Sequence, residues 1–147
     1  MVLSLSILGL AASLFLTAVQ PPPVTLEGEY RFETMDRGAG GGPVCTEVWT
    51  FGSEGQMTVT SGQEVVTKRF RTEVDDEGRW MVSESLTTNG LPDCMGNTSD
   101  GVTPGERRTY LMRRNSGSLV VCGPPARSAD GTLFVGPTCY GEIYPVG

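Results

Sequence analysis

The sequence contains no histidine, and its only lysine is Lys68. The absence of imidazole excludes Ser-His-Asp and Cys-His catalytic groups, histidine-based metal sites and histidine pH switches. The formal net charge of −6 at pH 7 disfavours nucleic acids and anionic membrane surfaces as partners. We therefore expect a protein that is not an enzyme, needs no cofactor and binds no nucleic acid.

Helical periodicity is also missing beyond residue 19. The segments instead alternate between apolar and polar residues with a period of two, which is typical of strands, and short turns join most of them. This pattern predicts an all-β fold in which about eight antiparallel strands form an up-and-down meander that closes as a barrel. A β-sandwich is the alternative. The expected strands are residues 27–34, 45–51, 56–60, 64–74, 79–86, 106–113, 118–122 and 139–146.

The first segment has the composition of a targeting sequence. Residues 1–20 hold an uncharged apolar run that stops at three prolines. This is typical of a secretory signal peptide, here with cleavage near residues 18–20, and a retained membrane anchor is the alternative. Residues 21–26 then form a Pro-rich lead-in, and residues 27–147 form a single β-barrel domain. We expect a secreted or periplasmic protein with no stable membrane insertion after signal cleavage.

Four cysteines lie in the part of the chain that follows the signal segment: Cys45, Cys94, Cys122 and Cys139. An even number in a small exported domain predicts two disulfides, with three possible pairings. Cys122 and Cys139 lie on neighbouring predicted strands, which favours a pairing of these two and of Cys45 with Cys94. A zinc site would need closely spaced cysteines or histidines, so no metal is expected.

Residues 87–105 form the longest stretch without strand alternation, and a loop of this length in a compact domain is usually functional or disordered. Strand direction reverses at each turn, so this loop shares one end of the predicted barrel with three others. These are residues 35–43, 61–63 and 123–138. All four cysteines are expected at the same end. We predict that this disulfide-pinned end binds a ligand, with Asn89, Asp93 and Asn97 as polar candidates.

Four charged residues fall on the strand faces that carry the aromatic and branched side chains: Glu47, Lys68, Glu84 and Arg108. These faces should point into the barrel, so the four charges are ligand-binding candidates. Arg108 offers two parallel donors for a carboxylate or phosphate group. The alternatives are a partly buried ion-pair network, or a bulge that shifts the phase of a strand. Glu47 and Glu84 also resemble a glycosidase carboxylate pair, but a structural role is favoured because no other catalytic motif accompanies them.

The same alternation predicts that five aromatic residues face inward: Tyr30, Trp49, Phe70, Trp80 and Tyr110. An eight-stranded barrel is just wide enough for side chains to fill it, so these residues are expected to form the core. A small apolar cavity between them is the alternative.

The order of the elements, together with Gly28-Glu29-Tyr30 at the start of the first strand, resembles the lipocalin/calycin type of small exported barrel. The family pattern has tryptophan where this chain has Tyr30. The resemblance implies the barrel topology of residues 27–147, and it transfers no functional residue.

Three functions are compatible with these features. The first is an exported, non-enzymatic barrel that binds a small ligand or an exported protein at its disulfide-pinned loop end. The second is an exported inhibitor of a secreted hydrolase, either a lysozyme or a protease. The third is a structural envelope protein of unknown role.

Overall fold

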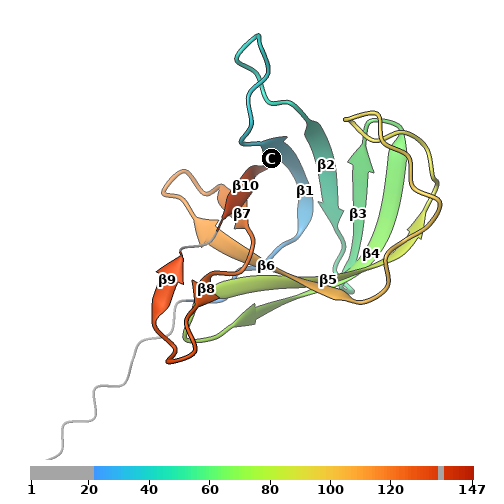
Figure 1. The fold of residues 1–147 in the computed structure, drawn as a ribbon. Helices are drawn as coiled ribbons and strands as arrows, with labels where there is room; N and C mark the ends of the chain where they lie inside the picture. Colours follow the sequence, from blue (N-terminus) through green and yellow to red (C-terminus); the bar gives the residue numbers. More distant parts are fainter. Residues whose placement is uncertain (1–21, 136–137) are drawn as a thin grey trace, which may run out of the picture.

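The computed structural model describes residues 22–135 and 138–147, and the regular structure within them is entirely β (Figure 1). Eight strands form a closed antiparallel barrel in the order β1-β10-β7-β6-β5-β4-β3-β2. They are β1 Gly28–Thr34, β2 Thr46–Phe51, β3 Gln56–Ser61, β4 Glu64–Val74, β5 Arg79–Thr88, β6 Glu106–Arg113, β7 Leu119–Cys122 and β10 Cys139–Pro145. This confirms the predicted closed meander over the β-sandwich. The expected signal peptide, residues 1–20, lies outside the described residues.

The first and last strands close the barrel. β1 pairs with β10 in an antiparallel register from Tyr30 opposite Pro145 to Thr34 opposite Gly141. Closure removes the unpaired strand edges that an open sheet would present to other chains. It also gives every strand an interior face and an outer face, which fixes which side chains meet inside.

Aromatic residues fill the interior, as the sequence predicted for Tyr30, Trp49 and Phe70. Trp49 stacks on Phe32 with ring centroids 5.0 Å apart. Phe51 makes edge-on contacts with Tyr30 at 5.4 Å and with Phe70 at 4.9 Å. Such offset and edge-on contacts are the arrangements that aromatic rings favour. Val24 and Leu26, in the expected lead-in, are 2% and 5% exposed and belong to the same core.

The predicted facing is wrong for β5, β6 and most of β10. Met81, Leu111 and Ile143 are the core residues of these strands. Because alternate residues face opposite ways, Trp80 and Tyr110 point outward. Trp80 is nevertheless only 1% exposed. It packs edge-on against Tyr110, with ring centroids 5.0 Å apart.

Apolar residues therefore occur on both faces of this part of the wall. All four residues of β7 are buried, including Cys122 and Val120 on the outer face. Figure 1 shows a small hairpin, β8 Ala126–Arg127 with β9 Leu133–Val135, beside this side of the barrel. Two-sided burial removes the alternation that normally reveals the inner face of a strand.

The hairpin also corrects the predicted position of residues 123–138. Arg127 Nε lies 2.5 Å from Glu77 Oε1, in the turn between β4 and β5. That turn was predicted at the opposite end of the barrel. The hairpin therefore extends along the outer wall, and only the other expected loops remain to frame the open end.

Both predicted disulfides are confirmed. Cys122 and Cys139 face each other across β7 and β10, with Cα atoms 3.8 Å apart. Cys45, just before β2, joins Cys94 in the long loop between β5 and β6. The first bridge fastens the base of the hairpin, and the second fastens the long loop to the opposite wall. The end of β1 hydrogen-bonds to Cys45 through Thr34 and to Tyr140 through Met35, so both bridges lie at the end of the barrel that was predicted for them.

Gly141 supplies a test of the interior packing. A Cβ atom added there would collide with the ring of Phe32. We expect Gly141→Ala to lower the free energy of unfolding by about 1–3 kcal/mol, because the packed core must shift to admit a methyl group. Urea unfolding measures the change. Gly40→Ala, in a loop with open space around the added atom, is the control, and equal effects at both positions would contradict the described interior.

Candidate functional site

A polar cavity of about 440 Å³ lies on the inner side of β4, β5 and β6, beneath the last part of the long loop. Cavities of this size are in the range that holds small ligands. Its lining consists of Glu64, Val66, Lys68, Ser83, Ser85, Thr88, Ser99, Gly101, Val102, Thr103, Pro104, Gly105, Glu106 and Arg107. The aromatic core and this cavity divide the barrel into an apolar part and a polar part.

The strand register explains why polar side chains meet here. Lys68 of β4 lies opposite Ser85 of β5, and Ser83 lies opposite Arg107 of β6. The pairing between β4 and β5 shifts next to Lys68, where Leu86 is the extra residue. Such a bulge changes which residues share a face. It brings Thr88 to the cavity together with Ser85.

Lys68 is the buried cation of the site. Burial lowers the pKa of its amine below the ordinary value. The Glu47 carboxylate opposes this shift, the Arg107 guanidinium adds to it, and the Glu64 carboxylate opposes it. A cation that loses hydration is stabilised by nearby negative charge and destabilised by nearby positive charge. The pKa of Lys68 therefore reflects opposing effects of these groups. Lys68 forms no direct ion pair with any described residue.

Both nearby carboxylates already accept hydrogen bonds. Thr88 Oγ1 donates to Glu64 Oε1 at 2.8 Å, and Trp49 Nε1 donates to Glu47 Oε2 at 2.7 Å. Neither Lys68 nor Arg107 has an ion pair within 4 Å or a hydrogen bond among residues 22–135 and 138–147. These two side chains can therefore still donate to a ligand.

Tyr140 and Thr109 extend the polar region toward β10 and β6. A bulge between Cys139 and Gly141 lets Tyr140 lie near the Phe32 ring, with centroids 6.5 Å apart. Burial raises the pKa of the Tyr140 hydroxyl, and its hydrogen bond with Thr109 opposes that shift. The charges of Arg107 and Glu47 also act on this hydroxyl. Tyr140 is itself 44% exposed, so it lies at the edge of the polar region.

Of the four predicted interior charges, the structure brings Glu47 and Lys68 together. The prediction for Glu84 and Arg108 is wrong, since both lie on the outer face. Arg69 Nη2 lies 2.6 Å from Glu84 Oε2. Glu47 and Glu84 therefore lie on different sides of the wall and cannot act on one substrate as a carboxylate pair.

Arg108 belongs to an outer cluster. Its Nη2 lies 2.8 Å from Asp75 Oδ2, and its guanidinium carbon lies 4.2 Å from the centre of a Trp80 ring. Trp80 Nε1 donates to Asp75 Oδ1 at 2.8 Å. Planar guanidinium groups commonly stack on aromatic faces in this way. Arg108 therefore stabilises the outer wall and does not face the cavity.

The polar residues of the long loop maintain its shape. Asn89 Oδ1 accepts hydrogen bonds from the backbone of Val65 and Leu91. Asp93 Oδ1 accepts from the backbone of Met95 and Asn97, each at 2.8 Å. These local bonds are typical of Asx turns. The Oδ1 atoms of Asn89 and Asp93 are thus already used as hydrogen-bond acceptors within the loop. Neither residue lines the cavity.

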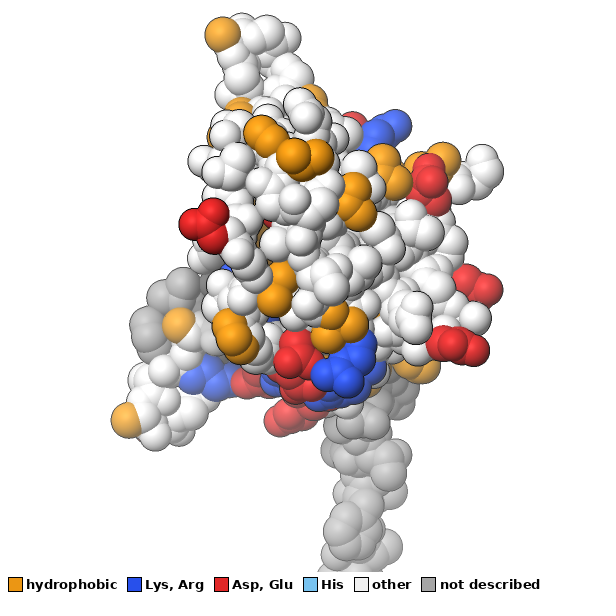
Figure 2. Space-filling model, turned by 90° about the vertical axis from the view of Figure 1, so that its right-hand side faces the viewer, with side chains coloured by type: hydrophobic (Ala, Val, Ile, Leu, Met, Phe, Trp, Pro, Cys, Tyr) orange, Lys and Arg blue, Asp and Glu red, His pale blue; other side chains and the backbone are white. Residues whose placement is uncertain are grey.

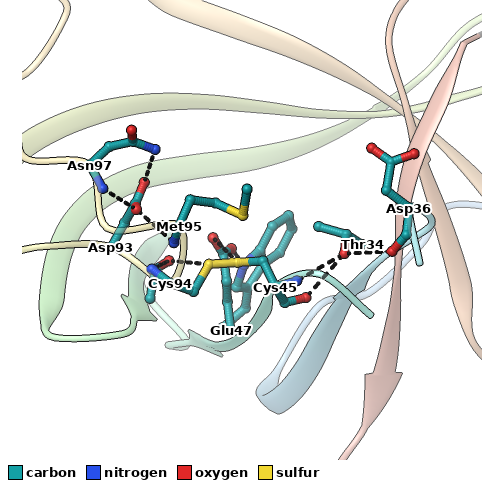
Figure 3. The surroundings of a disulfide bond; sticks show 10 residues. Thr34, Asp36, Cys45, Glu47, Asp93, Cys94, Met95 and Asn97 are labelled. Carbon is teal, nitrogen blue, oxygen red and sulfur yellow. Dashed lines mark hydrogen bonds between the residues drawn. A yellow bond between two sulfur atoms is a disulfide. The ribbon is translucent and has the colours of Figure 1, made fainter. Parts of the chain in front are cut away.

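Figure 3 shows how the Cys45–Cys94 disulfide joins the long loop to the start of β2, with Glu47 beside it. Ser61 Oγ accepts a hydrogen bond from the backbone of Cys94 at 3.2 Å. Gly62, at φ 59°, contacts the backbone of Asp93 so closely that a Cβ atom would collide with it. The loop is thus fixed from β2 and from the turn between β3 and β4.

The sulfur atoms of this bridge also lie within 4.8 Å of a Glu47 oxygen. No other cluster of metal-ligand side chains occurs in the part of the chain that the structure describes. Thiolates, and not disulfide sulfurs, are the usual metal ligands, so this cluster is not a metal site while the bridge is closed.

Figure 2 views the barrel from the side of the long loop. Acidic and basic side chains gather at the lower edge of this face, and apolar side chains are scattered over the rest without forming one continuous patch. Leu91 and Met95 of the loop are 47% and 56% exposed. Scattered apolar residues are normal on protein surfaces.

Sequence reasoning missed Arg107, Glu64, Ser83 and Ser85. Arg107 was passed over because Arg108 follows it and the predicted phase of β6 was shifted by one residue. The sequence of a single strand does not show which of two adjacent arginines faces the interior of the barrel. The sequence of β5 does contain a signal for Ser83 and Ser85. These small polar residues alternate with larger side chains on the other face of the strand, where Trp80 is buried.

No family model, curated protein or solved structure matches the chain in the three comparisons. The closed eight-stranded meander is compatible with a calycin-like topology. None of the described residues forms a helix that is long and apolar enough to cross a membrane. The two disulfides indicate a non-reducing environment of the extracellular type.

The outer cluster predicts a dependence of stability on pH. Hydrogen bonds from Arg108 and Trp80 lower the pKa of Asp75 to about 2. A lowered pKa stabilises the fold above the pKa of the unfolded chain, and this contribution disappears as pH falls toward 2. We expect Asp75→Asn to cost up to about 1 kcal/mol at pH 7, since the groups are partly exposed, and less as pH falls below about 4. Urea unfolding at several pH values, with the exposed neighbour changed in Asp76→Asn, tests this. A loss that is constant down to pH 2 would contradict it.

Proposed function

We propose that this protein is an exported, non-enzymatic barrel that binds a small anionic molecule in its polar cavity. The observation that carries the proposal is the pair of cations, Lys68 and Arg107, that line one cavity without an ion-pair partner among the described residues. Lys68 is half-buried and Arg107 is exposed at the edge of the cavity, so a bound anion would contact both and supply the missing negative charge. Hydrogen bonds between charged partners are stronger than neutral ones.

The remaining lining favours a small, polar ligand. Ser83, Ser85, Thr88, Ser99 and Thr103 supply hydroxyl groups that both donate and accept hydrogen bonds. Arg107 presents a planar pair of donors suited to carboxylate, phosphate or sulfonate groups. The nearby carboxylates of Glu64 and Glu47 limit the number of negative charges that the site tolerates. We infer a ligand with one anionic group and a polar body.

Export is supported by the two disulfides and by the signal-like composition of residues 1–20. The lipocalin/calycin resemblance agrees with a barrel that holds a ligand in its interior. A polar cavity differs, however, from the small apolar cavity that the aromatic residues had suggested as an alternative.

Titration calorimetry with inorganic phosphate and with pyruvate tests the proposal. We expect Lys68→Met and Arg107→Met each to weaken binding about tenfold or more, because each removes a charged donor worth roughly 1.5–3 kcal/mol. Arg69→Met is the matched control, since it removes the same charge next to Lys68 but from the outer face. Equal losses in all three variants, or no binding of either anion by the unaltered protein, would argue against the proposal.

Binding of a protein partner through the long loop is a second candidate. The loop is fixed by a disulfide and exposes Leu91 and Met95 next to it. Rigid loops with exposed apolar side chains suit insertion into the cleft of a hydrolase. We expect such an inhibitor to lose about tenfold or more in inhibition constant in the Leu91→Ser, Met95→Ser variant. Assays against lysozyme and serine proteases check this, and full activity of all the enzymes counts against it.

A further inference from the structure

Lys68 is the only lysine in the sequence, and it lines the cavity. Every other side-chain cation of the chain is an arginine, whose guanidinium stays protonated and is a poor nucleophile. The single side-chain amine of the protein is thus placed in a polar cavity large enough to hold a small molecule. The compact amine of Lys68 can react with a carbonyl group, whereas the planar guanidinium of an arginine cannot.

The surroundings of Lys68 favour a fraction of neutral amine. Burial lowers the pKa of Lys68, and Arg107 on β6 lowers it further. Glu47 on β2 and Glu64 on β4 oppose these effects. Tyr140 on β10 completes the set of titratable groups, since the charges of Arg107 and Glu47 also act on it. Desolvated lysines of this kind are the ones that form Schiff bases with carbonyl compounds.

We propose that Lys68 forms a reversible imine with a small ligand that carries an aldehyde or ketone group next to an anionic group, which Arg107 holds. The inference rests on the proposed function of the same cavity. Lys68 on β4 and Arg107 on β6 are separated by one strand and offset by two residues along it, so their Cα atoms are roughly 12 Å apart. Two long side chains across this span converge on a molecule of a few atoms, such as a 2-oxo acid.

The step balances without an oxidant or reductant. The nitrogen lone pair of the neutral amine adds to the carbonyl carbon and forms the C–N bond, while the carbonyl π electrons move to oxygen. The oxygen takes up a proton, and the nitrogen loses one, to give a carbinolamine. The hydroxyl group then leaves as water when the C=N bond forms. Glu64, a carboxylate that lines the same cavity, is positioned to transfer the proton.

Reductive trapping tests this chemistry on the intact protein. The protein is incubated with pyruvate and sodium cyanoborohydride, and intact-mass and peptide mass spectrometry locate the reduced adduct. We expect one adduct at Lys68 that forms about tenfold or more faster in the folded protein than in the chain unfolded in urea, because only the folded state holds the amine and Arg107 beside the same molecule. An equal or slower rate in the folded protein would overturn the proposal.

Two variants separate the roles of the amine and the guanidinium. Arg107→Met should slow trapping of pyruvate about tenfold more than trapping of acetone, because acetone has no anionic group and responds only to the loss of the effect of Arg107 on the pKa of Lys68. Arg69→Met should change neither rate. Lys68→Arg should still bind phosphate but give no adduct at this position. If Arg107→Met affects pyruvate and acetone alike, the assigned anion contact is wrong.

The trapping result and the binding result can fail independently. If pyruvate binds reversibly in calorimetry but gives no adduct at Lys68, the anion-binding function stands and the imine is refuted. If an adduct forms at Lys68 while neither phosphate nor pyruvate binds measurably and Arg107→Met has no effect, the anion-binding function is refuted. If neither occurs, both are refuted.

Discussion

Closure of the barrel between β1 and β10 is the constraint on which the other features depend. Once Thr34 lies opposite Gly141 and Tyr30 opposite Pro145, every strand has a defined interior face. The aromatic residues of β1, β2 and β4 then fill one part of the interior. The inward side chains of β4, β5 and β6 line the space that remains. These side chains are mostly polar, so the space between these strands and the long loop is a polar cavity that is partly open to solvent. The same closure removes exposed strand edges, which could otherwise pair with other chains.

The strand pattern was sufficient to predict the fold class, the strand order and both disulfides. Alternation is clear in β1 to β4, because those strands are buried on one face only. It failed in β5 and β6, where Trp80 and Tyr110 are covered from outside, and in β10, where a bulge shifts the phase after Tyr140. Burial of the outer face of a strand cannot be inferred from the sequence of that strand alone. For the same reason the candidate site was only half predicted: Lys68 and Glu47 were found, whereas Arg107 was mistaken for its neighbour Arg108.

The two arginines of β6 show how adjacent residues of one type acquire different roles. Arg108 lies outside, where Asp75 and the Trp80 ring satisfy its charge. Arg107 lines the cavity from the opposite face and is exposed at its edge, where no described carboxylate pairs with it directly. Outer ion pairs such as those of Arg108 contribute modestly to stability, since water screens them. A cation inside the barrel has a higher cost when it stays unpaired, because it loses hydration without a compensating partner.

The cost of the interior cations bears on the choice between a structural and a binding role. A barrel selected only for stability would place apolar residues or closed ion pairs at these positions, since well-packed apolar side chains often stabilise as much as buried charges do. Here the carboxylates of Glu47 and Glu64 instead accept hydrogen bonds from Trp49 and Thr88. The two cations therefore have no direct ion pair and can contact a ligand. Natural proteins tolerate such local losses of stability mainly at functional sites. The Cys45–Cys94 bridge offsets part of the loss and holds the loop over the cavity, so the same disulfide that stabilises the fold also keeps the site formed before any ligand arrives.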